Sequence, residues 1–219
     1  MKALSALALV AVTALVLLPG CGRQQPPADQ GAVVQPAPPP QPPAAPAAEQ
    51  PKAKPAGAQK KPYPNIAGTV VKLETDKGTI VLELYDKDLP RTVANFKQLV
   101  KDGYYDGKTF YRVEDWVIQA GENPHDLRPG LEFETSPKHT HDRGALGLAR
   151  TDDPNSGKTE FYIVKRDAHE LDDEGMQQRT GGMQRGYCCF GRTLEGLDVV
   201  DSVQMGDKIK RATIVQEAD

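Results

Sequence analysis

The sequence predicts a mostly-β domain: a closed barrel of eight short strands whose ends are covered by two helices. Three observations lead to this fold class. Short runs rich in β-branched and aromatic residues recur between residues 69 and 216, turn residues separate them, and only two stretches carry apolar residues at helical spacing. Many short strands with few helices are typical of an all-β barrel or sandwich.

The first elements are a β-hairpin and a helix. Residues 69–74 and 79–85 are rich in Val, Leu, Ile and Thr, and Asp76-Lys-Gly78 supplies a tight turn between them, so the two runs predict a hairpin. A helix then begins near Asp88 and ends at Gly103. Its apolar positions recur on one face; they are Val93, Phe96, Leu99 and Val100.

Residues 109–122 are the stretch around which the domain is organised. They predict two short strands with a tight bend at Glu114-Asp115, and they hold Arg112 and the only Trp of the chain, Trp116. An Arg between aromatic and β-branched neighbours costs free energy unless it has a partner or faces a cleft. Residue types alone leave two interpretations open: a functional Arg in a cleft, or an Arg on the wet face of an edge strand.

The remaining elements complete the strand count. Residues 144–149 form a strand of small residues that another segment can approach closely. Three further strands are expected at residues 160–164, 187–190 and 210–216. Apolar residues near 197–203 predict a second short helix, whereas segments 122–137 and 172–186 are polar, contain Pro or Gly, and predict surface loops.

Charge and cysteine content exclude several function classes. Residues 66–219 carry 21 Lys and Arg against 28 Asp and Glu, a net charge of −7, and an acidic domain without a basic stripe argues against binding of nucleic acid.

The cysteines and histidines of the domain do not indicate a disulfide or a metal site. Cys188 and Cys189 are neighbours on a strand and point to opposite faces, so we expect them to act as small apolar residues rather than to form a disulfide. His139-Thr-His141 lacks further ligands nearby and predicts a surface loop rather than a metal site. No metal or organic cofactor is implied.

The amino terminus predicts a secretory signal. Lys2 precedes an uncharged, mostly apolar run, residues 3–18, which is too short to span a membrane comfortably. The run ends in Leu18-Pro-Gly-Cys21, which resembles a bacterial lipoprotein cleavage site. Residues 1–20 are then the lipoprotein signal peptide, and Cys21 becomes the lipidated first residue, with acyl chains that form a firm anchor. The alternative is a plain secretory signal with an incidental Cys.

The segment between the signal and the domain predicts a tether. Residues 22–65 contain 13 of the 19 prolines and a single aromatic residue. Such a segment cannot bury enough apolar area to offset its ordering entropy. We therefore expect residues 21–65 to form a lipidated, disordered Pro/Ala-rich tether, and residues 66–219 to form the folded domain.

Several motifs of the folded region resemble the cyclophilin-type peptidyl-prolyl cis-trans isomerases, and most of all their bacterial periplasmic branch. They are Pro90-Arg-Thr-Val-Ala-Asn-Phe96, Gly103-Tyr-Tyr-Asp-Gly-Lys-Thr-Phe-Tyr-Arg-Val113, Trp116-Val-Ile-Gln-Ala-Gly121 and His141-Asp-Arg-Gly-Ala-Leu-Gly-Leu-Ala-Arg150. The match runs in order from residue 69 to residue 215. It implies a closed eight-stranded antiparallel β-barrel capped by two helices, and isomerisation of X-Pro peptide bonds.

The resemblance also implies a set of site residues. Arg112 matches the family's catalytic Arg, and Gln119 matches the Gln that binds the substrate backbone. Ala149 matches a residue beside the pocket that also binds the substrate backbone. Substrate-pocket positions are held by Trp116, Val117, Tyr162, Leu171 and Tyr187; the family usually has Phe, Met, Phe, Leu and His there. The bend before Trp116 is one residue shorter than usual, and the loop 172–186 is long.

The implied reaction needs little chemistry from the protein. Resonance gives the peptide bond a rotation barrier of ~18–20 kcal/mol, and a fixed Arg that donates to the twisted bond lowers it. The sequence thus predicts an isomerase, lipid-anchored in the bacterial cell envelope and facing the periplasm, that assists folding of exported proteins. Gly22 is not acidic, which favours the outer membrane, and we expect a monomeric domain. Two alternatives remain: a binding or chaperone module with little or no turnover, and a lipoprotein spacer that docks through loop 172–186.

Overall fold

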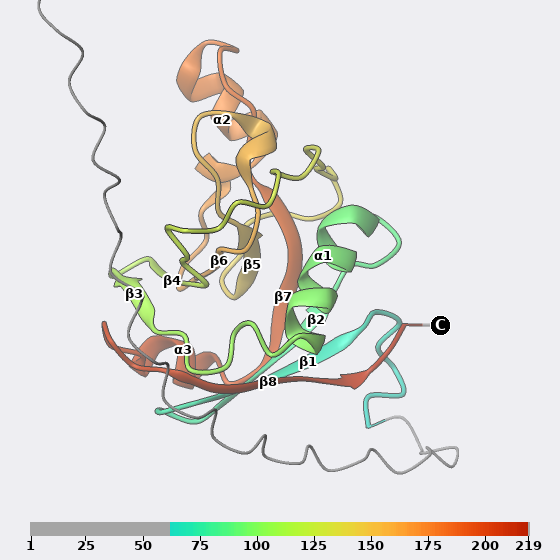
Figure 1. Ribbon diagram of the computed structural model, residues 1–219. Helices are drawn as coiled ribbons and strands as arrows, with labels where there is room; N and C mark the ends of the chain where they lie inside the picture. The colour runs from blue at the N-terminus through green and yellow to red at the C-terminus, as the bar shows by residue number, and fades with distance from the viewer. Residues whose placement is uncertain (1–61, 219) are drawn as a thin grey trace, which may run out of the picture. The chain divides into compact units, whose positions relative to one another are not determined.

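Eight antiparallel strands form one curled sheet in the computed structural model, which describes residues 62–218 (Figure 1). The spatial order is β3-β4-β6-β5-β7-β2-β1-β8. The strands are β1 (Val70–Thr75), β2 (Thr79–Leu84), β3 (Phe110–Val113), β4 (Val117–Ala120), β5 (Ala145–Leu148), β6 (Phe161–Val164), β7 (Cys188–Glu195) and β8 (Ile209–Gln216). Every strand predicted from the sequence is present, and β7 extends five residues further than expected because it pairs with both β5 and β2.

The two ends of the sheet, β3 and β8, meet at one place. A single bridge joins Thr109 to Lys208, and beside it the Phe110 amide donates to the Asp207 carbonyl at 2.8 Å. The described residues contain no longer ladder between β3 and β8. The sheet is therefore a curled half-barrel, and full closure of the barrel stays a prediction.

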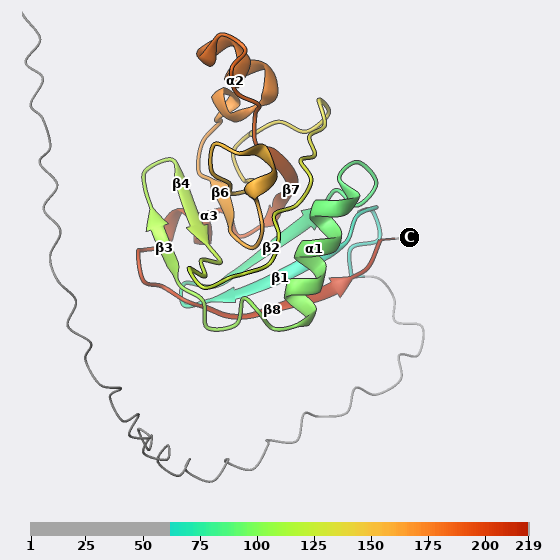
Figure 2. The ribbon, with the colours of Figure 1, turned by 45° about the horizontal axis from the view of Figure 1, so that its top comes forward.

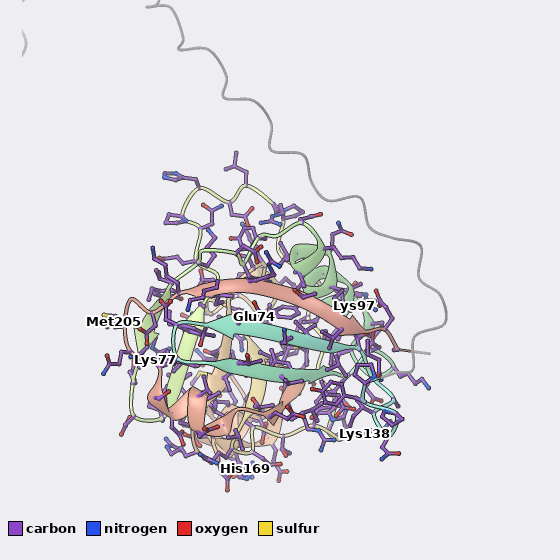
Figure 3. All side chains as sticks on the ribbon, turned by 90° about the horizontal axis from the view of Figure 1, so that it is seen from below. Glu74, Lys77, Lys97, Lys138, His169 and Met205 are labelled. Atoms are coloured by element: carbon purple, nitrogen blue, oxygen red, sulfur yellow. The ribbon has the colours of Figure 1, made fainter. Side chains whose placement is uncertain are left out.

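Both predicted helices are present. α1 (Pro90–Lys101) begins with a proline in its first turn, where the missing N–H leaves no unmet bond. Its buried face packs beside β8, and Lys97 on the same helix contacts Asp86 and Glu217 at 3.1 and 2.6 Å (Figures 2 and 3). α3 (Leu197–Ser202) packs on β2. Two short 3₁₀ turns, η1 (Pro154–Ser156) and η2 (His169–Leu171), and a third helix, α2 (Asp173–Thr180), complete the elements.

The prediction of a loop over residues 172–186 was wrong, because α2 (Asp173–Thr180) lies within it. Acidic residues in its first turn and Arg179 in its last complement the helix dipole, and Gly181, with φ of 63°, ends it. Only Met176 is buried, so the helix has no apolar stripe for a periodicity argument to detect. It stands at the opposite end of the molecule from β8 (Figures 1 and 2).

Acid should loosen the attachment of this segment. Hydrogen bonds from Arg185 (Nη2–Oδ2 2.7 Å), opposed by partial burial, hold the pKa of Asp173 below its ordinary value of 3.8. A lowered folded-state pKa stabilises the fold above pH ~4, and this contribution is lost as the pH falls through the folded-state value. Asp173→Asn should therefore cost about 1 kcal/mol at pH 7, after allowance for the exposed Arg185, and little at pH 2.

Urea unfolding at both pH values measures this difference. The control is Glu174→Gln, because the neighbouring carboxylate contacts only Gln178 (3.3 Å) among the described residues. An equal loss for Asp173→Asn at both pH values would contradict the assignment.

The core divides into two clusters. The larger one lies between α1 and the sheet, and its centre is aromatic: Phe96, Tyr105, Phe161 and Phe190. The smaller one joins β4, β5, β6 and η2 beneath the site described below; its buried members are Val117, Ala145, Tyr162, Val164, Ala168, Leu171 and Cys189.

The two adjacent cysteines lie one in each cluster. Cys188 and Cys189 are both buried free thiols, and burial raises the pKa of each to about 12. The prediction that they act as small apolar residues is confirmed.

The signal peptide, Cys21 and most of the predicted tether lie outside the described residues. Tyr63, near the start of the described residues, contacts the domain through its amide, which donates to Gln216 at 3.0 Å, and Gln216 in turn donates to the Ile66 carbonyl at 3.0 Å. No helix within residues 62–218 has the length and apolar character needed to cross a membrane.

Candidate active site

A pocket of about 310 Å³ opens over β3, β4 and β6, beside η2 and the start of β7. All eight of its sequence-predicted residues line it, together with one that was not predicted, Arg150. The full lining is Arg112, Trp116, Val117, Gln119, Ala149, Arg150, Tyr162, Leu171 and Tyr187. Two larger hollows, of about 660 and 670 Å³, which are among several on the described domain, are lined mostly by polar and charged side chains, whereas the predicted pocket sets the Arg112 cation beside an apolar cup formed by Val117, Tyr162 and Leu171.

Strand register places the central residues in one row. Arg112 on β3 pairs with Gln119 on β4, and Gln119 pairs with Tyr162 on β6. Residues that pair across strands point to the same face of a sheet. The row continues to Gly147 on β5, where an added Cβ would lie 2.1 Å from Tyr162 Cζ. Gly147 therefore leaves the space that the Tyr162 ring occupies.

Arg112 is held at the pocket by an acidic residue that the sequence analysis missed. Its Nε donates to Glu114 at 2.6 Å, and the Trp116 indole N–H donates to the other Glu114 oxygen at 2.8 Å. The guanidinium lies 5.2 Å from the Trp116 ring centroid. Hydrogen bonds from Arg112 and then Trp116 hold the pKa of Glu114 below its ordinary value. The shortened bend thus keeps Trp116 at the pocket and fixes both side chains through one carboxylate.

The two interpretations of Arg112 are partly reconciled. It does lie on an edge strand, and its side chain is 41 % exposed. Its guanidinium nevertheless lines the pocket, where Nη1 donates to Gln119 Oε1 at 3.2 Å. Two of its five N–H groups are used in these contacts, which leaves three for a ligand.

Gln119 is oriented by a half-buried polar pair, Tyr111 and Glu160. Its amide nitrogen donates to Glu160 at 2.9 Å and to the Tyr111 hydroxyl, which itself donates to Glu160. Burial, and then the hydrogen bond to Glu160, raise the pKa of Tyr111. Because these two acceptors occupy the amide nitrogen, the Gln119 carbonyl oxygen faces Arg112, from which it accepts. Tyr111 and Glu160 were not predicted, since neither stands near Gln119 in the sequence.

The cup itself is apolar. Val117, Tyr162 and Leu171 are 1 %, 5 % and 8 % exposed, and the ring of Tyr187 meets that of Tyr162 edge to face at 6.2 Å. Ala149 lies at the rim. Its amide already donates to the Glu160 carbonyl at 2.9 Å, so its carbonyl is the backbone group left for a peptide.

Arg150 is the pocket residue that the sequence analysis missed, although it follows Ala149 in a quoted motif. Its guanidinium stacks 4.3 Å from the Tyr187 ring centroid and donates to the carbonyls of Thr151 (2.6 Å) and Gly186 (2.9 Å). It places a second positive charge at the pocket, beside Tyr187. Among the described residues, no group of three or more His, Cys, Asp or Glu side chains is arranged to bind a metal ion.

Comparisons with known proteins agree with this geometry. The model of the family "Cyclophilin type peptidyl-prolyl cis-trans isomerase/CLD" matches residues 70–218. The chain is 36 % identical over 142 residues to the peptidyl-prolyl cis-trans isomerase cyp18 of Streptomyces antibioticus, covering 62 % of this chain and 83 % of that protein. It is 36 % identical over 152 residues to a peptidyl-prolyl cis-trans isomerase of Synechococcus elongatus, covering 67 % and 96 %.

The fold is similar to that of a solved cyclophilin, AquaCyp293 from Hirschia baltica, with a TM-score of 0.55, 23 % identity, and coverage of 66 % of this chain and 73 % of that one. A likeness at that identity concerns the fold alone. The family match spans the whole sheet and both predicted helices, and it includes every residue of the pocket. The chain therefore belongs to the cyclophilin-type peptidyl-prolyl cis-trans isomerases.

Proposed function

We propose that the pocket holds the proline of X-Pro segments in unfolded, exported polypeptides, and that Arg112 catalyses rotation of the preceding peptide bond. One observation carries this proposal: Arg112, Gln119 and Tyr162 stand in one row across three strands above an apolar cup. The reaction needs a cation that donates to the twisted bond, an amide that binds the peptide backbone and an apolar cup that holds the proline ring, and these three residues supply them.

The physical chemistry of the bond assigns the roles. In the twisted state, conjugation is lost and the proline nitrogen becomes more basic, so a donor that meets it there stabilises the transition state more than either planar state. Arg112 is permanently charged and retains free N–H groups. Glu114 limits where the guanidinium can go, which reduces the entropy lost when it engages the bond.

The remaining residues bind rather than react. Trp116, Val117, Tyr162 and Leu171 hold the proline ring, while Gln119 and the Ala149 carbonyl hold the peptide on either side. Tyr187 and Arg150 close the rim. The ring is apolar, so its burial in this cup is favourable without any polar partner.

Turnover of a short X-Pro peptide by the mature chain tests the activity. NMR exchange spectroscopy should show cis and trans signals that interconvert faster with the protein than without it, since the uncatalysed exchange takes tens to hundreds of seconds. A second candidate, a binding or chaperone module with little turnover, is favoured by Trp116 and the shortened bend. It predicts shifted peptide signals with an unchanged exchange rate, which would exclude the isomerase proposal.

The proposed setting is the bacterial cell envelope. The run 3–18 followed by Leu18-Pro-Gly-Cys21 supports a lipid anchor, the Pro-rich segment up to residue 65 supports a spacer, and Gly22 favours the outer membrane. The domain would face the periplasm as a monomer and meet exported chains there. The alternative left by the sequence is a lipoprotein spacer that docks another envelope protein through segment 172–186.

Lipidation can be tested at one residue. Cys21→Ser should move the protein from the membrane fraction to the soluble fraction, because the thioether that carries the acyl chains cannot form. The activity on a short peptide should not change, since the residues described as lining the pocket all belong to the predicted folded domain, residues 66–219. Mass spectrometry of the native amino terminus is the direct measurement, and an unmodified residue there would remove the anchor.

A further inference from the structure

His141 is a buried histidine directly behind the proline pocket, in a motif predicted to be surface loop. Its side chain is fully buried. Nδ1 lies 2.6 Å from Asp172 Oδ1, and Nε2 lies 2.8 Å from the Tyr162 hydroxyl. The imidazole thus joins a carboxylate on one side to a pocket residue on the other.

The position of one imidazole proton follows from its partner. Burial opposes ionisation of Asp172, but hydrogen bonds and charge from His141, with a further bond from His169, hold the Asp172 pKa below its ordinary value. An ionised carboxylate only accepts, so Nδ1 of His141 donates to Asp172. The hydrogen bond between Nε2 and the Tyr162 hydroxyl then holds the imidazole between these two partners.

The same histidine also holds the opposite wall of the pocket. Its carbonyl accepts from the Ala168 amide at 2.7 Å, and its own amide donates to Asp172 at 3.0 Å. These two bonds bracket segment 168–172, which carries Leu171. His141 is therefore tied to Tyr162 through its ring and to the segment of Leu171 through its backbone and ring.

Other contacts hold the Tyr162 ring only from the sides. It passes over Gly147, which has no side chain to restrain it, and meets Tyr187 edge to face. Among residues 62–218, the hydrogen bond to His141 is the one that the Tyr162 hydroxyl makes, and it holds the far end of the ring. A Phe here would fill the same space without this tie.

We propose that His141 is a positioning residue for the isomerase, which fixes the distance between the Tyr162 and Leu171 walls and so sets the affinity for the proline ring. The inference rests on the proposed function of the pocket. His141 touches no substrate. Arg112 lies on β3 and is held by its own partner, Glu114. A change at His141 should therefore leave the rate of bond rotation in the bound peptide unaltered.

Three variants of the mature chain separate this role from a merely structural one. His141→Asn keeps a donor near Asp172 but is too short to reach Tyr162, whereas His141→Gln can place an amide group near the position of Nε2. Tyr162→Phe removes the tie from the other side. The matched control is His139→Gln, whose ring stacks on Tyr85 at 3.6 Å and bonds Asp88 at 2.9 Å, outside the pocket.

Trp116, the only Trp of the chain, reports peptide binding directly by its fluorescence. We expect His141→Asn and Tyr162→Phe each to raise KM and Kd for an X-Pro peptide about three- to tenfold, the effect of one hydrogen bond, with kcat nearly unchanged. His141→Gln should restore most of the affinity, and His139→Gln should not change it. In the Tyr162→Phe background, His141→Asn should lower stability further without raising KM further.

Two results would overturn the proposal. One is a loss of stability in His141→Asn with KM and Kd unchanged. The other is an equal rise in KM for His141→Gln and His141→Asn, both folded. If the His141 variants prove unstable, Tyr162→Phe alone decides, because unchanged affinity there means that the tie is not used. Failure of the unsubstituted chain to accelerate isomerisation would instead count against the proposed function.

Discussion

Arg112→Ala is expected to lower kcat/KM for a short X-Pro peptide by roughly one to three decades, at about 1.4 kcal/mol per decade. The reason is that Arg112 supplies the only donor of the pocket predicted to act more strongly on the twisted bond than on the planar one. The apolar cup stays intact in the variant, so peptide affinity measured by Trp116 fluorescence should fall much less. Arg112→Lys should not restore the rate, because a single ammonium cannot reproduce a planar fork that binds Glu114, Gln119 and the substrate together.

Arg166 supplies a matched control for this experiment. Its guanidinium also lies over the Trp116 ring, at 5.9 Å, and also pairs with a carboxylate, that of Glu170 at 3.1 Å, but it does not line the pocket. Arg166→Ala should change kcat/KM little. Because Arg112 is 41 % exposed, its removal should leave the urea midpoint nearly unchanged. Equal losses of rate and affinity would make Arg112 a simple binding residue, and unfolding would make it a structural one.

Phe96→Ala is expected to cause the largest loss of stability, about 3–5 kcal/mol. Phe96 projects from α1 into the aromatic centre of the larger core, where its ring lies 5.1 Å from Tyr105, 5.6 Å from Phe161 and 5.1 Å from Phe190. The truncation removes buried apolar area and leaves a cavity between Tyr105, Phe161 and Phe190 that the surrounding structure closes only in part. A loss of this size corresponds to a fall in Tm of about 10 °C for a domain of this length.

Urea and thermal unfolding measure this loss, with Leu127→Ala as the control, since Leu127 is 96 % exposed. The folded fraction of Phe96→Ala should keep its KM, because Phe96 belongs to the larger cluster and the pocket rests on the smaller one. A loss below about 1 kcal/mol would show that α1 repacks on the sheet, contrary to the close packing of protein interiors.

The elements visible in the sequence are those specified by neighbours along the chain. The hairpin of β1 and β2 follows from alternating β-rich runs around Asp76-Lys-Gly78, and α1 follows from the apolar face that Phe96 represents. The pocket residues were found because their motifs lie in contiguous stretches of a few residues each. Register then brought these stretches together as the family resemblance implied.

The features that the sequence did not reveal depend on partners far along the chain. Helix α2 has no apolar stripe, so it was assigned to a loop. Glu114 stands two residues from both Arg112 and Trp116, yet only the bend shows that one carboxylate serves both.

The sequence by itself determined a mostly-β fold with two amphipathic helices, because periodicity is a local property of a chain, and its contiguous motifs carried the family resemblance that implied eight pocket positions. Tertiary structure alone decided how those positions are held. Gln119 is oriented by Glu160, 41 residues away, and Tyr162 is tied to His141, 21 residues away, across strands that meet only after folding. A hydrogen bond between distant residues depends on ångström distances, and no pattern of residue types along the chain encodes these distances.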